Sequence, residues 1–196
     1  MMTPRRTHNI VLAAAALVLT AALVPALNAT GAQTTGQPYT PNVEHGAYLV
    51  KTMLCNDCHT PWTLGPKGPE PDMSRALTGH PEDLKLPPAP QLPEGPWVIV
   101  ASASMTAWSG PWGTSYTANL TPDKETGLGD WTEEMFIKTM RTGLHQGKGR
   151  PVLPPMPWPW IGQLNDSDLK DLFAYLQSLP PVKNRVPAPI DPTEPQ

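Results

Sequence analysis

Apolar side chains recur at helical spacing in three stretches of the chain, residues 43–54, 131–142 and 166–179. This spacing gives each stretch one apolar face, which is typical of a helix that packs on a core. The residues on these faces are Ala47, Tyr48, Val50 and Leu54; Met135, Phe136, Thr139 and Met140; and Leu169, Leu172, Phe173, Leu176 and Leu179. The pattern therefore predicts three amphipathic helices.

Capping residues support these three helices. Asn42 and Asn165 precede the first and third stretches, where a short polar side chain can accept the free N–H groups of a helix start. Either Asp130 or Thr132 can cap the second stretch, and Gly143 can end it. The sequence thus predicts the helices together with their ends.

Gly46 lies inside the first predicted helix, where glycine costs about 1 kcal/mol of helix propensity relative to alanine. A residue without a side chain is useful there if a second helix crosses closely. We expect the helix over 166–179 to make this crossing, with Phe173 or Tyr175 near Gly46.

Residues 61–121 lack helical periodicity and are dominated by proline, glycine and tryptophan. Gly-Pro and Pro-Pro pairs recur as turn signals at residues 65–66, 68–69, 87–88, 95–96 and 110–111. A short helix at 72–78 and a brief strand at 97–101 are the regular elements we expect. Four tryptophans argue against disorder, in which aromatic residues are scarce. We predict an ordered, extended and irregular insert that wraps around the functional centre.

The first 32 residues have the organisation of an export signal. Arg5 and Arg6 form a positive start, residues 10–27 are almost uninterruptedly apolar, and small residues follow as candidate cleavage positions. Retention is the alternative, because the 18 residues of 10–27 reach the lower limit for spanning a bilayer. We therefore predict a periplasmic protein with a signal peptide or N-terminal anchor at 1–32, then a linker at 33–41.

The remaining chain has the length of one domain and an unusual composition. The sequence contains 27 prolines and two phenylalanines, where proline near about 5% is usual. Such a chain builds few long elements and a modest core, which a large bound group could complete. The formal net charge of −3 argues against a nucleic-acid-binding protein, since those need a basic surface. We expect one domain at residues 42–186 and a proline-rich tail at 187–196.

Residues 55–59, Cys-Asn-Asp-Cys-His, contain the only two cysteines of the chain. This C-x-x-C-H spacing is typical of a c-type haem attachment site, in which both thiols bind porphyrin vinyl groups and the histidine becomes the proximal iron ligand. We therefore predict one covalent haem c, with its iron, held by Cys55, Cys58 and His59. The outer ring N–H of His59 should donate to a backbone carbonyl, for which Pro61 is a candidate.

Other uses of the two cysteines are less favoured. A four-sulfur metal site would need at least two more cysteines. A thioredoxin-like redox pair would need a β-α-β pattern, whereas the flanking residues are rich in proline and glycine. A Cys2His2 zinc site and a plain disulfide between Cys55 and Cys58 are the remaining alternatives.

The loop between the last two predicted helices offers a second iron ligand. Met156 lies there between two prolines, which fix φ and bias the residues before them toward extended backbone. A thioether on so stiff a loop loses little freedom on ligation, and we predict Met156 as the distal ligand. Met105 is the next candidate, and His80 or His145 would give a bis-histidine site.

Residues 135–165 include no acidic residue but four basic ones, Lys138, Arg141, Lys148 and Arg150. One interpretation is a positive rim beside the haem that steers an acidic redox partner. The other is that these residues pair with haem propionates or are scattered in space.

These motifs resemble those of the class I-like monohaem cytochromes c, and in particular the cytochrome modules associated with bacterial periplasmic dehydrogenases. The resemblance runs over residues 42–186, with C-x-x-C-H at 55–59, Asn-Leu-Thr-Pro-Asp at 119–123, Pro-Met-Pro at 155–157 and a terminal helix at 164–181. It implies an all-α, cytochrome c-like fold of three to four helices around one covalent haem. The long Pro/Trp-rich irregular insert departs from a minimal cytochrome c.

The resemblance also implies a periplasmic electron carrier, free or as a dehydrogenase subunit, rather than an enzyme. His59 and Met156 would be the axial ligands, and a dehydrogenase, an oxidase or another cytochrome would be the redox partner. The alternative is a haem enzyme or sensor whose sixth iron site opens to peroxide or a gas. Met156 separates the two hypotheses, because a closed site disfavours ligand chemistry. Membrane contact is expected only if residues 10–27 are retained.

Overall fold

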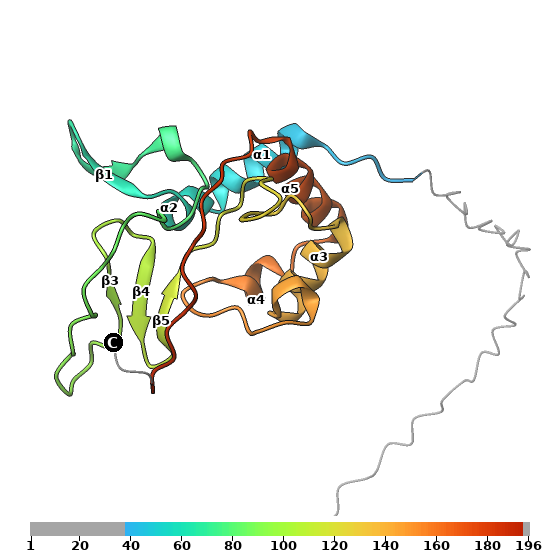
Figure 1. Ribbon diagram of the computed structural model, residues 1–196. Helices are drawn as coiled ribbons and strands as arrows, with labels where there is room; N and C mark the ends of the chain where they lie inside the picture. The colour runs from blue at the N-terminus through green and yellow to red at the C-terminus, as the bar shows by residue number, and fades with distance from the viewer. Residues whose placement is uncertain (1–37, 194–196) are drawn as a thin grey trace, which may run out of the picture. The chain divides into compact units, whose positions relative to one another are not determined.

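Short helices and short strands build residues 38–193, which are the part of the chain that the computed structural model describes. The α-helices are α1 (Val43–Thr52), α2 (Cys55–His59), α3 (Glu133–Thr142), α4 (Trp158–Ile161) and α5 (Asp166–Ser178), and the 3-10 helices are η1 (Met73–Arg75) and η2 (His145–Gly147). The strands are β1 (Trp62–Gly65), β2 (Gly68–Pro71), β3 (Val100–Ala101), β4 (Ala107–Gly110) and β5 (Gly113–Tyr116). Helices α1, α3 and α5 lie together, with β3–β5 to one side (Figure 1). The expected signal or anchor at 1–32 lies outside the described residues.

The three predicted amphipathic helices are confirmed as α1, α3 and α5. Asn42, Thr132 and Asn165 each accept a hydrogen bond from a backbone N–H three residues further on, at 2.8–3.1 Å. The cap of α3 is therefore Thr132 and not Asp130. Helix α1 ends before Leu54, because that residue adopts a left-handed φ of 58° and turns the chain.

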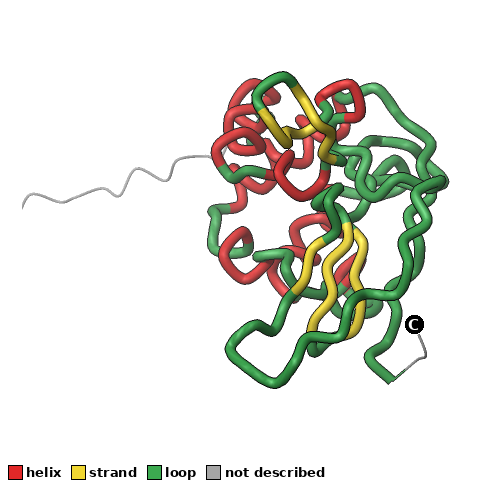
Figure 2. Tube along the Cα trace, turned by 90° about the vertical axis from the view of Figure 1, so that its left-hand side faces the viewer, coloured by secondary structure: helices red, strands yellow, loops and turns green. Residues whose placement is uncertain are grey.

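The expectation of an all-α fold is wrong, because two small antiparallel sheets accompany the helices (Figure 2). About 31% of the described residues are helical and 13% are extended in strands, which makes the domain a mixed one. The insert that we expected to be irregular contains both sheets, β1–β2 and β3–β4–β5. The expected helix at 72–78 is only the turn η1, and the expected strand at 97–101 is reduced to β3.

A repeated turn sequence explains the two hairpins. Gly-Pro-x-Gly occurs at residues 65–68 and 110–113, and each copy joins two paired strands. Gly68 and Gly113 have φ values of 118° and 91°, a region open to glycine but strained for other residues. The turns could be found in the sequence. Their strands could not, because four residues are too few to show a clear alternation.

The core lies between α1, α3 and α5, and includes Leu49, Val50, Leu77, Leu128, Phe136, Met140, Leu169, Leu172, Phe173 and Leu176. The predicted close crossing of α1 and α5 at Gly46 is confirmed. A Cβ atom on Gly46 would lie 2.0 Å from the backbone oxygen of Asp171 and 2.8 Å from the Cβ of Tyr175. Only glycine lets the two helices approach this closely.

A buried carboxylate reinforces the same crossing. Asp171 of α5 is 1% exposed. It accepts hydrogen bonds from the Tyr39 hydroxyl (2.8 Å), the Asn42 N–H (2.6 Å) and Nδ1 of His45 (2.9 Å). Burial by itself raises the pKa of Asp171, but the hydrogen bonds from Asn42, His45 and Tyr39 together hold that pKa below its ordinary value. The carboxylate therefore stays ionised and ties the start of α1 to α5.

The segment after α5 is bonded to the insert along its length. The Asn184 side chain donates to the carbonyl oxygens of Thr78 (2.6 Å) and His80 (2.9 Å). Ile190 pairs with Thr114 of β5 through two backbone hydrogen bonds of 2.9 Å. The described part of the expected tail, residues 187–193, is thus extended and attached to the three-stranded sheet.

Candidate functional site

The C-x-x-C-H motif forms helix α2, one turn set at an angle to α1 by the left-handed Leu54. Cys55 and Cys58 are three residues apart in this helix, so their side chains lie on the same face. Both are free thiols, and both are partly buried. Burial raises the pKa of Cys55 to about 11 and also raises the pKa of Cys58. Within the described residues, no disulfide joins Cys55 and Cys58.

His59 completes α2 and is 8% exposed. Its Nδ1 lies 2.8 Å from the backbone oxygen of Ala118. A carbonyl only accepts hydrogen bonds, so Nδ1 carries the proton and Nε2 keeps its lone pair. Burial lowers the pKa of His59, which favours this neutral form. Within residues 38–193 no group donates to Nε2, which leaves it available as a metal ligand.

The carbonyl partner of His59 differs from the expected one. We expected Pro61, whose oxygen instead accepts the N–H of Asp72 at 2.9 Å. Ala118 is 59 residues away from His59 in the sequence, and its place beside the ring depends on the whole insert. A backbone acceptor has no side-chain signature, so residue patterns could not identify it.

Thr60, the residue that directly follows the C-x-x-C-H motif, holds α2 in place. Its side chain is fully buried, donates to Oδ1 of Asn56 at 2.8 Å and accepts the N–H of Leu77 at 2.9 Å. These bonds connect the end of α2 to the insert and fix the direction in which His59 leaves the helix.

Met156 lies in the loop between η2 and α4, partly buried against the hydrophobic core. Val152, at the start of this loop, donates its N–H to the oxygen of Gly143 at 2.8 Å. Ser115 of β5 donates its hydroxyl to the oxygen of Pro154 at 2.6 Å. The loop is therefore held by the end of α3 on one side and by the insert on the other.

The alternative ligands are less well suited. Both ring nitrogens of His80 are in use, Nδ1 at 2.9 Å from the Thr106 hydroxyl and Nε2 at 3.1 Å from the oxygen of Leu84. His145 is exposed and meets the ring of Trp131 edge-on, with centroids 5.0 Å apart. Met105 lies in the tight turn between β3 and β4, with a left-handed φ of 55°. Of the two candidate methionines, Met156 packs against the core cluster, whereas Met105 is not among the hydrophobic residues that do so.

The basic residues of 135–165 do not form one uniform set. Arg141 is paired with Asp166 (2.6 Å) and is thereby neutralised. Lys138 is exposed, and its aliphatic part covers Gly147 of η2. Lys148 and Arg150 follow on the exposed chain beyond η2, without an acidic partner among the described residues. Three of the four positive charges therefore stay available.

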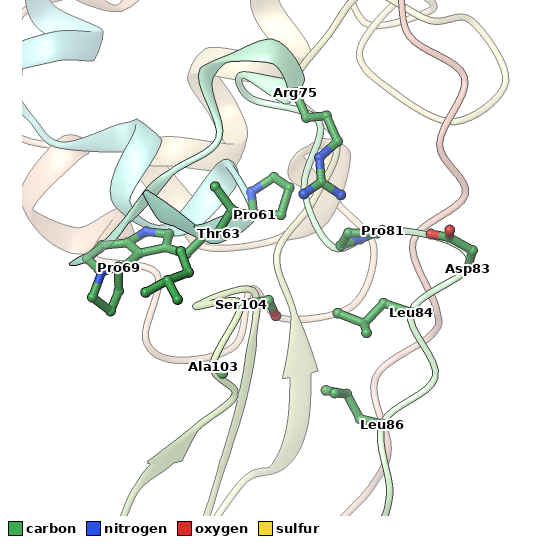
Figure 3. A pocket seen from close by; sticks show the side chains of 12 residues that line it. Pro61, Thr63, Pro69, Arg75, Pro81, Asp83, Leu84, Leu86, Ala103 and Ser104 are labelled. Atoms are coloured by element: carbon green, nitrogen blue, oxygen red, sulfur yellow. The ribbon is translucent and has the colours of Figure 1, made fainter. Parts of the chain in front are cut away.

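A separate cleft of about 610 Å³ opens in the insert. Figure 3 shows Pro61, Thr63 and Pro69 of the β1–β2 region on one side and Leu84 and Leu86 on the other. The cleft is mostly apolar, and its Arg75 is already paired with Asp72. None of its lining residues is a cysteine, His59 or Met156, although Trp62 in the lining donates its indole N–H to the oxygen of Asp57 in α2 at 2.9 Å.

Comparisons of the sequence with known proteins indicate the family of the chain. The family model described as Cytochrome c matches residues 43–180. A nicotinate dehydrogenase component of Pseudomonas putida is 41% identical over 88 residues, which are 45% of this chain and 7% of that protein. The cytochrome c subunit of alcohol dehydrogenase (quinone) from Gluconobacter oxydans is 39% identical over 80 residues, or 40% of this chain and 16% of that one. The fructose dehydrogenase cytochrome subunit of Gluconobacter japonicus is 36% identical over 89 residues, or 42% and 18%.

The chain spans less than a fifth of the length of these relatives. Across residues 38–193, the helices are too short or too polar for any of them to cross a membrane.

Proposed function

The chain belongs to the cytochrome c family, and from this premise we propose that it is a periplasmic monohaem electron carrier with His/Met-ligated iron that serves a dehydrogenase. Membership of the family implies covalently bound haem c with its iron, and electron transfer through it. The proposal adds the ligands, the compartment and the partner.

The residues of α2 fit a covalently bound haem c. Cys55 and Cys58 would supply the two thioether sulfurs, and His59 the proximal nitrogen. The observation that carries this assignment is the hydrogen bond from His59 Nδ1 to Ala118, since it leaves an unpartnered Nε2 on a buried, neutral ring. Bound haem supplies a one-electron iron couple, whose potential methionine–histidine ligation raises.

Met156 would close the sixth position. Support comes from its place in a proline-flanked loop, its packing against the core and the poor suitability of His80, whose nitrogens are already bonded. A closed sixth position favours a carrier, because little rearrangement accompanies a change in iron charge. It disfavours the alternative of a haem enzyme or gas sensor.

The compartment and the partner rest on different observations. Arg5, Arg6 and the apolar stretch 10–27 support export, since c-type attachment in bacteria takes place outside the cytoplasm. The names of the relatives support a dehydrogenase as partner, because two of the relatives are the cytochrome subunits of an alcohol dehydrogenase (quinone) and of a fructose dehydrogenase. The partner is therefore proposed as a class of enzyme.

Spectroscopy of the purified holoprotein tests the proposal. We expect haem that resists extraction into acid acetone, and a low-spin ferric spectrum with the weak near-infrared band of sulfur–iron ligation. Met156→Ala should abolish this band, lower the reduction potential and admit carbon monoxide to the ferrous protein. Met105→Ala is the matched control and should leave all three readouts unchanged. The opposite pattern would assign Met105 as the ligand, and an unchanged spectrum in both variants would point to a histidine.

A further inference from the structure

Among the described residues, one side-chain hydrogen bond joins the insert to the Met156 loop, and its donor is Ser115. This residue is 8% exposed and lies in the middle of β5, opposite Trp108 of β4. Its hydroxyl lies 2.6 Å from the oxygen of Pro154, two residues before Met156. A second possible acceptor, the oxygen of Trp108, is 3.3 Å away. A hydroxyl has one proton to donate, and the shorter distance assigns it to Pro154.

The lone pairs of the same hydroxyl are also engaged. The indole N–H of Trp112 donates to Ser115 Oγ at 3.3 Å. Trp112 is placed for this bond by the Gly-Pro-Trp-Gly turn, because its ring folds back over Gly110, where a Cβ would lie 2.6 Å from the ring. Trp112, Ser115 and Pro154 therefore form a chain of two hydrogen bonds from the hairpin turn to the loop.

Strand β5 is itself anchored on its other edge. Thr114 exchanges two backbone hydrogen bonds of 2.9 Å with Ile190. The closeness of this contact excludes a side chain at Gly113, since a Cβ there would lie 2.0 Å from the oxygen of Ile190. The sheet is thus fixed to the C-terminal segment. Because Ser115 of this sheet is hydrogen-bonded to Pro154, the Met156 loop is fixed as well.

We propose that Ser115 is a positioning residue for Met156, and that the three-stranded sheet of the insert acts as a clamp that keeps the sixth iron position closed. The inference rests on the proposed function, because it takes Met156 as the distal ligand. It assigns the insert a role that the sequence left open. Loss of the clamp should raise the fraction of molecules whose loop has moved away from the iron.

Imidazole measures this fraction directly, because it binds ferric haem only when the methionine has left. The apparent affinity of such a ligand rises in proportion to the open population. For Ser115→Ala we expect imidazole to bind about fivefold or more tightly than to the parent, the change that follows from the loss of one intramolecular hydrogen bond. The near-infrared band should weaken, and the reduction potential should fall.

Ser109→Ala is the matched control. Ser109 lies in β4 of the same sheet, and its hydroxyl accepts from the Thr114 hydroxyl at 3.1 Å without touching Pro154. It should leave imidazole affinity and the near-infrared band unchanged. Trp112→Phe removes only the donor to Ser115, so it should produce a smaller shift in the same direction. It also provides a second variant if Ser115→Ala does not yield folded holoprotein.

Equal imidazole affinities in the parent, Ser115→Ala and Trp112→Phe would overturn the clamp while leaving Met156 as the ligand. Equal shifts in Ser115→Ala and Ser109→Ala would also overturn it, because they would indicate a general loosening of the sheet. A near-infrared band that Met156→Ala does not change would refute the ligand assignment itself, and the clamp with it.

Discussion

The crossing of α1 and α5 at Gly46 gives a sharp test of the packing. In Gly46→Ala the new Cβ would lie 2.0 Å from the backbone oxygen of Asp171, more than 1 Å inside ordinary van der Waals contact. The obstructing atom belongs to a helix backbone, so relief requires α5 to shift. Overpacking of this kind costs about 1–3 kcal/mol. The gain of about 1 kcal/mol in helix propensity opposes it.

We expect the clash to outweigh the propensity gain, because the shift would also disturb the hydrogen bonds that Asp171 accepts from Tyr39 and Asn42. The expected net loss is about 1–2 kcal/mol, or a fall of about 2–8 °C in Tm for a domain of this size. Thermal unfolding of the ferric holoprotein, followed by circular dichroism, measures it.

Gly95→Ala is the matched control for Gly46→Ala. Gly95 lies in an exposed loop, where the atom nearest to an added Cβ is 3.9 Å away. The free energy of unfolding of this variant should stay within about 0.5 kcal/mol of the parent value. A Gly46→Ala protein as stable as the parent, or more stable, would show that the two helices can separate at little cost, and the close-crossing argument would fail.

Two further predictions concern charge. The pKa of Asp171 is below its ordinary value in the folded protein, so its contribution to stability is present near neutral pH and is lost as the pH falls through that lowered pKa. Denaturant titrations from neutral pH into the acid range should therefore show that the free energy of unfolding falls less with acidification in Asp171→Asn than in the parent. Equal slopes of this free energy against pH in the two proteins would contradict the prediction. Charge reversal at Lys138 and Lys148 should slow electron transfer with an acidic partner, most strongly at low salt, where screening is weak. Lys67→Glu, on the tip of the β1–β2 hairpin, is the control, and equal low-salt rates for all three proteins would remove the steering hypothesis.

The sequence by itself determined the helices and the chemistry of the motif. Helices α1, α3 and α5 follow from apolar spacing and, for α1 and α5, from the caps at Asn42 and Asn165, because these signals act between residues three or four positions apart. At the start of α3 the sequence offered Asp130 or Thr132, and the structure selected Thr132. The C-x-x-C-H motif likewise can be recognised from five adjacent residues. Gly46 also led to a correct prediction of a distant contact, since a glycine inside a helix lowers its propensity but is useful where a second helix crosses closely.

Only the tertiary structure decided the features that join distant segments. The all-α expectation failed because the strands of the insert are stabilised by pairing across turns and not by a pattern within each strand. Ala118 supports His59 through a backbone oxygen, which every residue possesses, so no residue type marks it. Ser115 reaches Pro154 across 39 residues by a bond that depends on the register of β5. Such contacts are set by how the whole chain folds, because the groups that form them are common and their specificity lies in their placement.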